Sequence, residues 1–183
     1  DLSRLPLDDA LTFQLIQAGK TKGVFQLEAP QVQNMLVKMQ PDTFRDIIAV
    51  NALNRPATLA ASVEGRSMVD IFISRKHGRE KPQYAHPVMQ EVLAETHGIM
   101  VYQEQVMRIL NRLGGIDLSQ AYTCIKAISK KQKDKIDNNR EQFLAGAIKL
   151  GLAEAKAEEI FELIVAFGGY GFNKSHSVAY GLV

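Results

Sequence analysis

The sequence has a single cysteine, Cys124, so no disulfide can form within its 183 residues, and this favours a reducing, cytoplasmic location. No apolar run approaches the ~20 residues that a membrane-spanning helix needs. The 6 prolines and 13 glycines follow no period, which excludes a collagen-like or low-complexity chain. Because 22 Lys and Arg face 20 Asp and Glu, the net charge is only +2 and does not identify a nucleic-acid-binding protein by itself.

What the sequence does contain is typical of a globular domain. Apolar residues make up 46% and charged residues 23%, enough to build a core, and the length fits one domain or one piece of a larger protein. No signal-peptide pattern follows Asp1, and residues 175–183 resemble the opening of a helix that stops without a cap at its end. We therefore expect a segment of a longer chain.

Helical periodicity dominates the chain. Helices are expected at residues 8–19, 30–39, 42–53, 63–76, 86–97, 102–113, 119–128, 131–150 and 154–167, with another opening near residue 175. Residues 22–27 and 99–101 favour short strands, and residues 55–59 a break. The predicted fold is mainly α with one or two short strands (α+β), which by itself indicates no function.

Catalytic motifs are scarce. No Asp-x-Asp suits a two-metal site, and Asp134 and Asp137 stand among lysines, which favours a solvated helix face. The sequence also lacks a Walker A motif, a Gly-x-Gly-x-x-Gly motif and zinc-ligand spacing. Cys124, alone in an expected helix, is interpreted as a small buried hydrophobe and not as a nucleophile.

Three stretches are candidates for contacts with a polyanion, and each has a structural alternative. Residues 75–79 (Arg-Lys-His-Gly-Arg) either complement a helix end or contact phosphate. Residues 126–140 carry six basic and two acidic side chains, a net +4, and form either a polyanion-facing surface or a solvated face. Residues 168–177 combine glycines, Tyr170 and Phe172 with Asn-Lys-Ser-His. They suit either triphosphate and base binding or a connection capped by Asn173 or Ser175.

Five motifs resemble the bacterial DNA polymerase III alpha subunit, the C-family replicative polymerase. They occur in family order over nearly all of the chain, and they are VFQLE (24–28), IIAVNALNRP (47–56), FISRKHG (72–78), GIMVYQEQVM (98–107) and YGFNKSHSVAY (170–180). The resemblance implies that residues 1–60 are the C-terminal part of the palm and residues 61–183 the N-terminal and central part of the fingers. The catalytic palm core, the PHP domain and the C-terminal domains would lie outside this segment.

The resemblance also implies an activity. A DNA-directed DNA polymerase transfers a nucleotide from a dNTP to a primer 3′-hydroxyl with two Mg²⁺ ions, and its three metal-binding aspartates are expected upstream of Asp1. This chain alone is therefore expected to be inactive. The implied partners are primer–template DNA, dNTPs, and a sliding clamp and other replisome subunits that bind elsewhere.

Family positions carry over to individual residues. Those expected to bind the dNTP are Arg55, Lys126, Asn173, Lys174, Ser175 and His176. The cationic residues are expected to neutralise charge on the β- and γ-phosphates as the primer 3′-hydroxyl attacks in line. Those expected to contact DNA or phosphate are Arg75, Lys76, His77, Gln103, Gln105, Lys130 and Lys131.

The chain departs from the family pattern at two places. Residues 55–58 read Arg-Pro-Ala-Thr where the family has Arg-Pro-Gly-Pro, and residues 124–131 read CIKAISKK where it has LRRAMGKK. Ile125 and Lys126 thus stand where two arginines are expected, which removes bidentate phosphate contacts. Two interpretations stay open: an active but divergent polymerase, such as a phage-encoded one, or a non-catalytic remnant that binds DNA or a partner.

Overall fold

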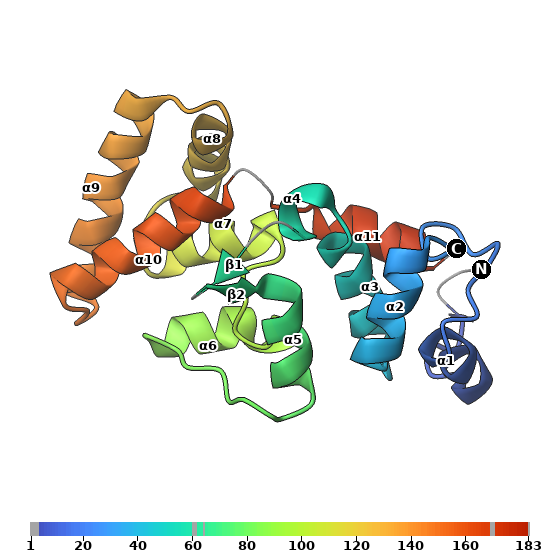
Figure 1. Cartoon of the computed structure of the whole chain (residues 1–183). Coiled ribbons are helices and arrows are strands. Elements are labelled where there is room, and N and C mark those ends of the chain that lie inside the picture. The colour runs from blue at the N-terminus through green and yellow to red at the C-terminus, as the bar shows by residue number, and fades with distance from the viewer. Residues whose placement is uncertain (1–3, 60–61, 64, 169–170, 183) are drawn as a thin grey trace. The chain divides into compact units, whose positions relative to one another are not determined.

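The computed structural model describes residues 4–59, 62–63, 65–168 and 171–182 (Figure 1). In these ranges the structure is helical apart from loops and one short antiparallel strand pair, which confirms the predicted fold class. The elements are α1 (Ala10–Gln17), α2 (Pro30–Met39), α3 (Phe44–Leu53), α4 (Pro56–Leu59), β1 (Ser62–Val63), β2 (Arg66–Ser67), α5 (Met68–Lys76), α6 (Pro87–Leu93), η2 (Ala94–Thr96), α7 (Gln103–Arg112), α8 (Leu118–Ser129), α9 (Lys133–Lys149), α10 (Glu154–Phe167) and α11 (Lys174–Gly181).

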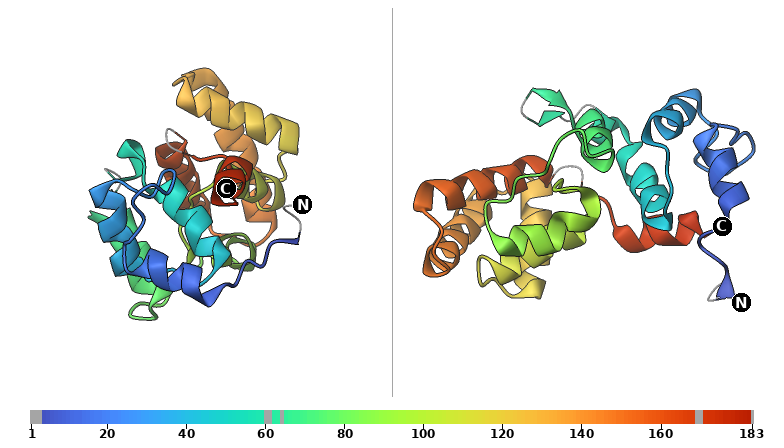
Figure 2. Two further views of the ribbon diagram at one scale, coloured as in Figure 1. Left: turned by 90° about the vertical axis from the view of Figure 1, so that its right-hand side faces the viewer. Right: turned by 90° about the horizontal axis from the view of Figure 1, so that it is seen from below.

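The chain divides into two compact units, each described here by itself. The first unit comprises residues 1–81 and 173–183, and the second comprises residues 82–172. In the first unit α11 lies along α3 although the two are far apart in sequence (Figure 2). The buried hydroxyl of Ser177 donates a hydrogen bond to the Ile48 carbonyl oxygen at 2.9 Å, which joins the two helices.

Local sequence signals explain most helix starts. The Asp9 carboxylate accepts a hydrogen bond from the Thr12 N–H at 2.7 Å and caps α1. At the start of α3, Thr43 and Asp46 form a reciprocal capping box. Proline occupies the first turn of α2 and of α6, where its missing N–H costs no helical hydrogen bond.

The second unit contains a core of side chains from α6 to α10. It includes the aromatic pair Phe143 and Phe161, whose ring centroids are 5.6 Å apart, with Leu110 and Leu113 fully buried beside Ile109. These side chains come from α7, α9, α10 and the residue that follows α7. The core therefore holds α9 in place, and the exposed lysines at the start of α9 are positioned with it.

The predicted strands lie elsewhere than expected. Residues 22–27 form turns, because Gly23 and Gln26 have φ angles of 84° and 62°, which no strand tolerates. Residues 99–101 are not a strand either; the adjacent Tyr102 makes one isolated parallel bridge with Phe172. The strands that do form are β1, which ends at the first residue of the helix expected at residues 63–76, and β2, which lies within that range; the helix itself begins only at Met68. The segment expected as a break contains the single turn α4.

Candidate nucleic-acid interface

The predicted nucleotide residues 173–176 form the start of α11 in the first unit. The Asn173 side-chain oxygen accepts a hydrogen bond from the His176 N–H at 2.9 Å and so caps the helix. Ser175 and His176 are exposed and Lys174 is half-buried, while the His176 ring meets the Tyr180 ring edge-on at 4.4 Å. Asn173 thus has an observed structural role as the cap, and the triphosphate contact of this segment stays a prediction.

Arg55 follows the C-terminal end of α3, the helix along which α11 packs. Its carbonyl oxygen accepts a hydrogen bond from the Leu59 N–H at 2.8 Å, which closes the single turn of α4, and the residue is half-buried. Pro56 opens this turn, and the hydroxyl of buried Thr58 donates to the Ala52 carbonyl oxygen at 3.4 Å. Residues 57–58 are Ala-Thr where the family pattern has Gly-Pro, and in this chain they lie within a short helix that directly follows Arg55.

Arg75 and Lys76 lie in internal ion pairs at the end of α5. Arg75 Nε is 3.0 Å from Glu80, whose carboxylate also lies 2.8 Å from Arg66. Hydrogen bonds from Arg66 and Arg75 hold the pKa of Glu80 below its ordinary value. Lys76 Nζ lies 2.6 Å from Asp42 and 3.1 Å from Asp46, and its side chain is only 9% exposed.

His77 is exposed, and its Nε2 lies 3.1 Å from the Lys38 carbonyl oxygen. It lines an open pocket of about 660 Å³ together with the exposed cations Lys38, Arg66 and Arg79 and the carboxylate of Asp70. Lys38 and Arg79 were not selected from the sequence. The sequence places Arg79 at the end of the basic stretch 75–79, so it could have been selected. Nothing in the local sequence around Lys38 indicates that it lies near Arg79.

In the second unit, Lys126 is exposed on α8 and its Nζ lies 4.3 Å from the centre of the Tyr122 ring. Sequence reasoning missed Tyr122, although a spacing of four residues on a helix predicts contact between the two side chains. Ile125 and Cys124 point into the core. Burial raises the pKa of the Cys124 thiol to about 11, which agrees with the interpretation of this residue as an unreactive hydrophobe.

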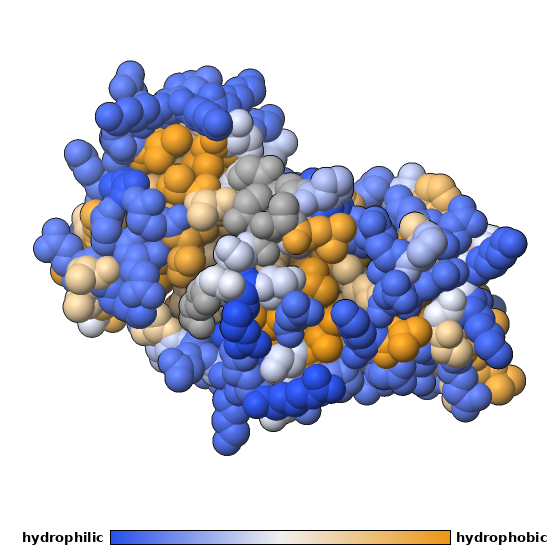
Figure 3. Space-filling model, viewed as in Figure 1, coloured by the Kyte–Doolittle hydropathy of each residue, from blue (hydrophilic) through white to orange (hydrophobic). Residues whose placement is uncertain are grey.

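Lys130 and Lys131 lie in the connection between α8 and α9, and both are exposed, as are Lys133 and Lys135 on the first turn of α9. Hydrophilic residues cover this connection and the outer side of α9 (Figure 3). Arg140 differs from the lysines because it pairs with Glu158 and Glu162 and lies 5.1 Å from the centre of the Phe161 ring.

Gln103 and Gln105 begin α7 in the second unit. The Gln103 N–H donates to the Phe172 carbonyl oxygen at 2.9 Å, and its side chain is half-buried. Gln105 is 3% exposed: its side-chain oxygen accepts from the backbone N–H groups of residues 101 and 102, and its amide donates to the Thr96 hydroxyl at 2.8 Å. The side chain of Gln105 is thus fully occupied inside the unit, and its DNA contact remains an untested prediction.

The described residues contain no group of three or more His, Cys, Asp or Glu side chains that could hold a metal ion. They therefore do not fit the two-magnesium site of a nucleotidyl-transfer reaction. A search of the same part of the chain for helices long and apolar enough to cross a membrane finds none.

Together these observations define a mainly helical domain that carries an exposed cationic surface. The family model that describes the bacterial DNA polymerase III alpha subunit finger domain matches residues 1–151. The chain therefore belongs to this family, as its motifs predicted.

Curated relatives agree with this assignment. The chain is 46% identical over 179 residues to the DNA polymerase III subunit alpha of Aquifex aeolicus (98% of the chain and 15% of that protein). It is 43% identical over 182 residues to that of Chlamydia pneumoniae (100% and 14%) and 40% identical over 183 residues to that of Bacillus subtilis (100% and 16%). The chain thus spans about one seventh of the length of these relatives.

Proposed function

We propose that this chain is part of a DNA-directed DNA polymerase and that it holds the incoming dNTP and the primer–template. Membership in the finger-domain family supports the proposal, because relatives at 40–46% identity bear the name of a polymerase subunit. The proposed substrates are dNTPs and primer–template DNA. The two Mg²⁺ ions would be bound by residues outside this chain.

The observation that carries the proposal is the exposed basic segment of the second unit. Residues 126–137 contain five lysines and two aspartates, all exposed, so this segment carries a net charge of +3. None of the five lysines forms an ion pair with another described residue. Exposed cations that form no internal ion pair can exchange their counterions for phosphates, which is the main source of affinity for nucleic acid.

Each unit by itself carries residues that are proposed to contact the nucleotide. Lys126 would meet the triphosphate as a point charge, whereas Arg55 retains a planar guanidinium that can bind two phosphate oxygens at once. The start of α11 carries Lys174 beside the positive end of the helix dipole. The Ser175 hydroxyl there donates a hydrogen bond to the Asn173 side-chain oxygen, which it would exchange for one to a phosphate. Charge neutralisation by these groups would stabilise the transition state of phosphoryl transfer.

We also propose, from the family resemblance, a division of the chain into two parts, a location in the cell and further binding partners. The division is into palm (residues 1–60) and fingers (residues 61–183), and the finger-domain match covers residues on both sides of that boundary. The location is cytoplasmic, and the partners are a sliding clamp and other replisome subunits that bind through regions outside this chain.

The test is Lys126→Ala in the polypeptide that carries this chain. We expect the KM for dNTPs to rise about tenfold or more, because a charged phosphate contact is lost, while the Kd for primer–template changes less than twofold. Steady-state incorporation and DNA titration measure the two quantities. Lys149→Ala is the matched control, since Lys149 is an exposed lysine at the C-terminal end of α9, outside the basic segment. Equal losses in KM and Kd would contradict the nucleotide role.

A non-catalytic remnant that binds DNA or a partner is the second candidate. The burial of Ile125, which is 6% exposed in the core, favours it, because the position where the family has a phosphate-binding arginine here faces the interior. Primer extension with the full polypeptide separates the candidates. Incorporation of dNTPs supports the polymerase, and DNA binding without incorporation supports the remnant.

A further inference from the structure

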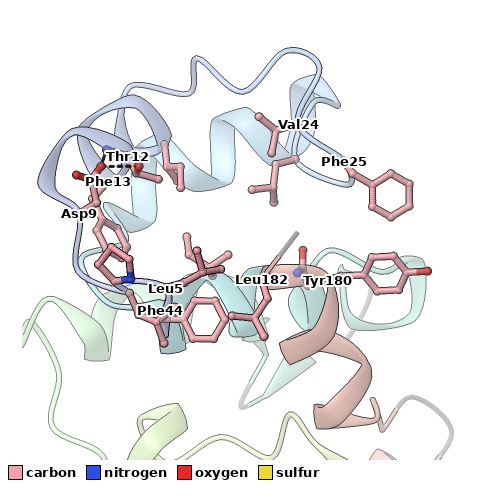
Figure 4. Close-up of a pocket in the computed structure, with 16 residues that line it drawn as sticks. Leu5, Asp9, Thr12, Phe13, Val24, Phe25, Phe44, Tyr180 and Leu182 are labelled. Carbon is pink, nitrogen blue, oxygen red and sulfur yellow. Dashed lines mark hydrogen bonds between the residues drawn. The ribbon is translucent and has the colours of Figure 1, made fainter. Parts of the chain in front are cut away.

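The outward face of α8 carries an exposed aromatic ring that has no role in the proposed polymerase function. Tyr122 is 42% exposed, whereas the other phenylalanine and tyrosine side chains in the described part of the second unit are buried or half-buried. The other exposed phenylalanine and tyrosine rings, Phe25 and Tyr180, lie in the first unit and pack against each other with centroids 5.1 Å apart (Figure 4). Tyr122 has no aromatic partner among the described residues, and a lysine lies against it instead.

Tyr122 belongs to a ridge of exposed side chains along α8. The ridge consists of residues at intervals of four, namely Leu118, Tyr122, Lys126 and Lys130. Residues four apart share one face of a helix and lie about 6 Å apart along its axis. Ile125 is buried in the core and fixes which face of α8 points outward. The ridge therefore changes from apolar to cationic between Tyr122 and Lys126, within about one helical turn.

Tyr122 and Lys126 already contact each other. The Lys126 ammonium nitrogen lies over the face of the Tyr122 ring, 4.3 Å from its centre. No carboxylate pairs with Lys126 in the described part of the second unit, so its charge is available to a phosphate. At an exposed site, a cation–π contact shifts an equilibrium only about two- to fivefold. The contact thus holds the ammonium beside the ring, and a ligand that binds both groups can replace it.

A nucleotide has the two groups that this pair can bind. Stacking of a base on an aromatic side chain is worth roughly five- to 150-fold in affinity, which exceeds the cation–π contact that it would replace. Lys126 is proposed to bind the triphosphate, so the base of the same molecule is the planar group available to the ring. Resting on that proposed function, we propose that Tyr122 stacks on the base of the incoming dNTP while Lys126 binds its phosphates.

This contact would add affinity without selecting a base. Every base has an aromatic face, so stacking contributes to the binding of all four dNTPs. The chain has Ile125 where the family pattern has an arginine, and that side chain is buried. Stacking on Tyr122 therefore supplies affinity that does not depend on the missing phosphate contact.

The test compares a ligand that has a base with one that has none. Inorganic tripolyphosphate, used as an inhibitor of incorporation at fixed free Mg²⁺, presents phosphates alone. In the full-length polypeptide that carries this chain, Tyr122→Leu should raise the KM for each dNTP about fivefold or more. The Ki for tripolyphosphate and the Kd for primer–template should change less than twofold. Lys126→Ala should raise both KM and Ki, whereas Tyr122→Phe keeps the ring and should leave KM within twofold of the native value.

A second measurement does not depend on incorporation. 5-Iodo-dUTP is bound with a primer–template whose primer lacks its 3′-hydroxyl, and ultraviolet light crosslinks iodouracil to an aromatic side chain stacked on it. Mass spectrometry of the peptides should place the crosslink at Tyr122, and Tyr122→Leu should abolish it.

Four results would overturn the proposal. They are an unchanged KM in Tyr122→Leu, a Ki for tripolyphosphate that rises as much as KM, a Tyr122→Phe variant that behaves like Tyr122→Leu, and a crosslink to Tyr122 that is absent or comes only from iodouracil in the template. A polypeptide that incorporates no dNTP would contradict the polymerase activity, and the crosslink with 5-iodo-dUTP would then decide the base contact by itself.

Discussion

At the residue scale, Lys76 belongs to a family motif and forms ion pairs that stabilise the fold. Burial lowers the pKa of Lys76, but hydrogen bonds and charge from Asp42 and Asp46 outweigh burial and hold this pKa above its ordinary value. The hydrogen bond from Lys76 holds the pKa of Asp42 below its ordinary value. The ammonium joins the end of α5 to the start of α3, so the charge that the motif suggested for phosphate is used within the first unit.

Lys76→Met should lower the free energy of unfolding by roughly 2–3 kcal/mol, below the ~3–5 for a fully buried pair, because Asp46 keeps hydrogen bonds from residues 42 and 43. Urea denaturation measures the loss. Lys38→Met, at an exposed lysine, is the control and should change stability by less than about 0.5 kcal/mol. A loss as small as that of the control would show that the ion pairs do not stabilise the fold.

The ion pair between Lys76 and Asp42 also predicts how the free energy of unfolding depends on pH. Asp42 has a lowered pKa when folded, so its contribution is present above about pH 4 and is lost as pH falls through the folded pKa. Lys76 has a raised pKa, so its contribution is complete below about pH 10 and is lost at higher pH. Urea midpoints should therefore fall less steeply below pH 4 in Lys76→Met than in the unaltered protein.

At the scale of the elements, glycine decides how α7 and α9 meet in the second unit. A side chain on Gly146, within α9, would collide with the backbone of Gly114, which follows α7. Backbone atoms cannot rotate away as a side chain can. The close approach therefore requires glycine at position 146 although glycine is a poor helix former.

Gly146→Ala should destabilise the protein by about 2 kcal/mol, since overpacking costs ~1–3 kcal/mol or more and outweighs the gain in helix propensity of ~1 kcal/mol. Chemical denaturation followed by circular dichroism measures it. Ala145→Gly is the control in the same helix: Ala145 is exposed, and the change should cost only about 1 kcal/mol of propensity. A Gly146→Ala variant more stable than the native chain would refute the close approach.

At the scale of the whole molecule, the charge is nearly balanced but unevenly distributed. The net charge is +2, whereas residues 126–137 alone carry +3, so the remaining residues sum to −1. Arg140, next along α9, adds little to this surface because it pairs with Glu158 and Glu162. The exposed lysines, and not total charge, are thus the feature to test.

Replacing Lys130, Lys131, Lys133 and Lys135 with Gln should weaken DNA binding and make it less sensitive to salt. Each phosphate contact adds about 0.9 to the magnitude of the slope of log K against log salt, so the slope should fall by up to about 3–4. Titrations of the full polypeptide with primer–template at several salt concentrations give this slope. The charge-matched control replaces four other exposed lysines with Gln, namely Lys20, Lys22, Lys81 and Lys149. Equal slopes in both variants would contradict a localised DNA surface.

Local signals made much of the fold predictable. The sequence predicted α2 and α10 with the bounds that the structure has. It also narrowed the caps of α1 and α3 to two neighbouring residues each, Asp8 or Asp9 and Asp42 or Thr43, because a cap acts on the adjacent turn, and the structure has Asp9 and Thr43. The strands were misplaced because the pairing of residues 62–63 with 66–67 depends on a turn at Gly65, which helical periodicity at 68–76 obscured. Strand identity depends on a partner, and a single segment does not contain it.

The sequence by itself determined the family, the mainly helical fold and the basic segments, because motifs, periodicity and charge are properties of neighbouring residues. Only the tertiary structure decided how each charged or polar side chain is used. It pairs Lys76 with two aspartates and buries Gln105 in a hydrogen-bond network. It also leaves the lysines of residues 126–135 exposed and the Asn51 side-chain oxygen buried without a hydrogen bond. These outcomes depend on contacts between residues distant in the chain, which form only when the helices pack.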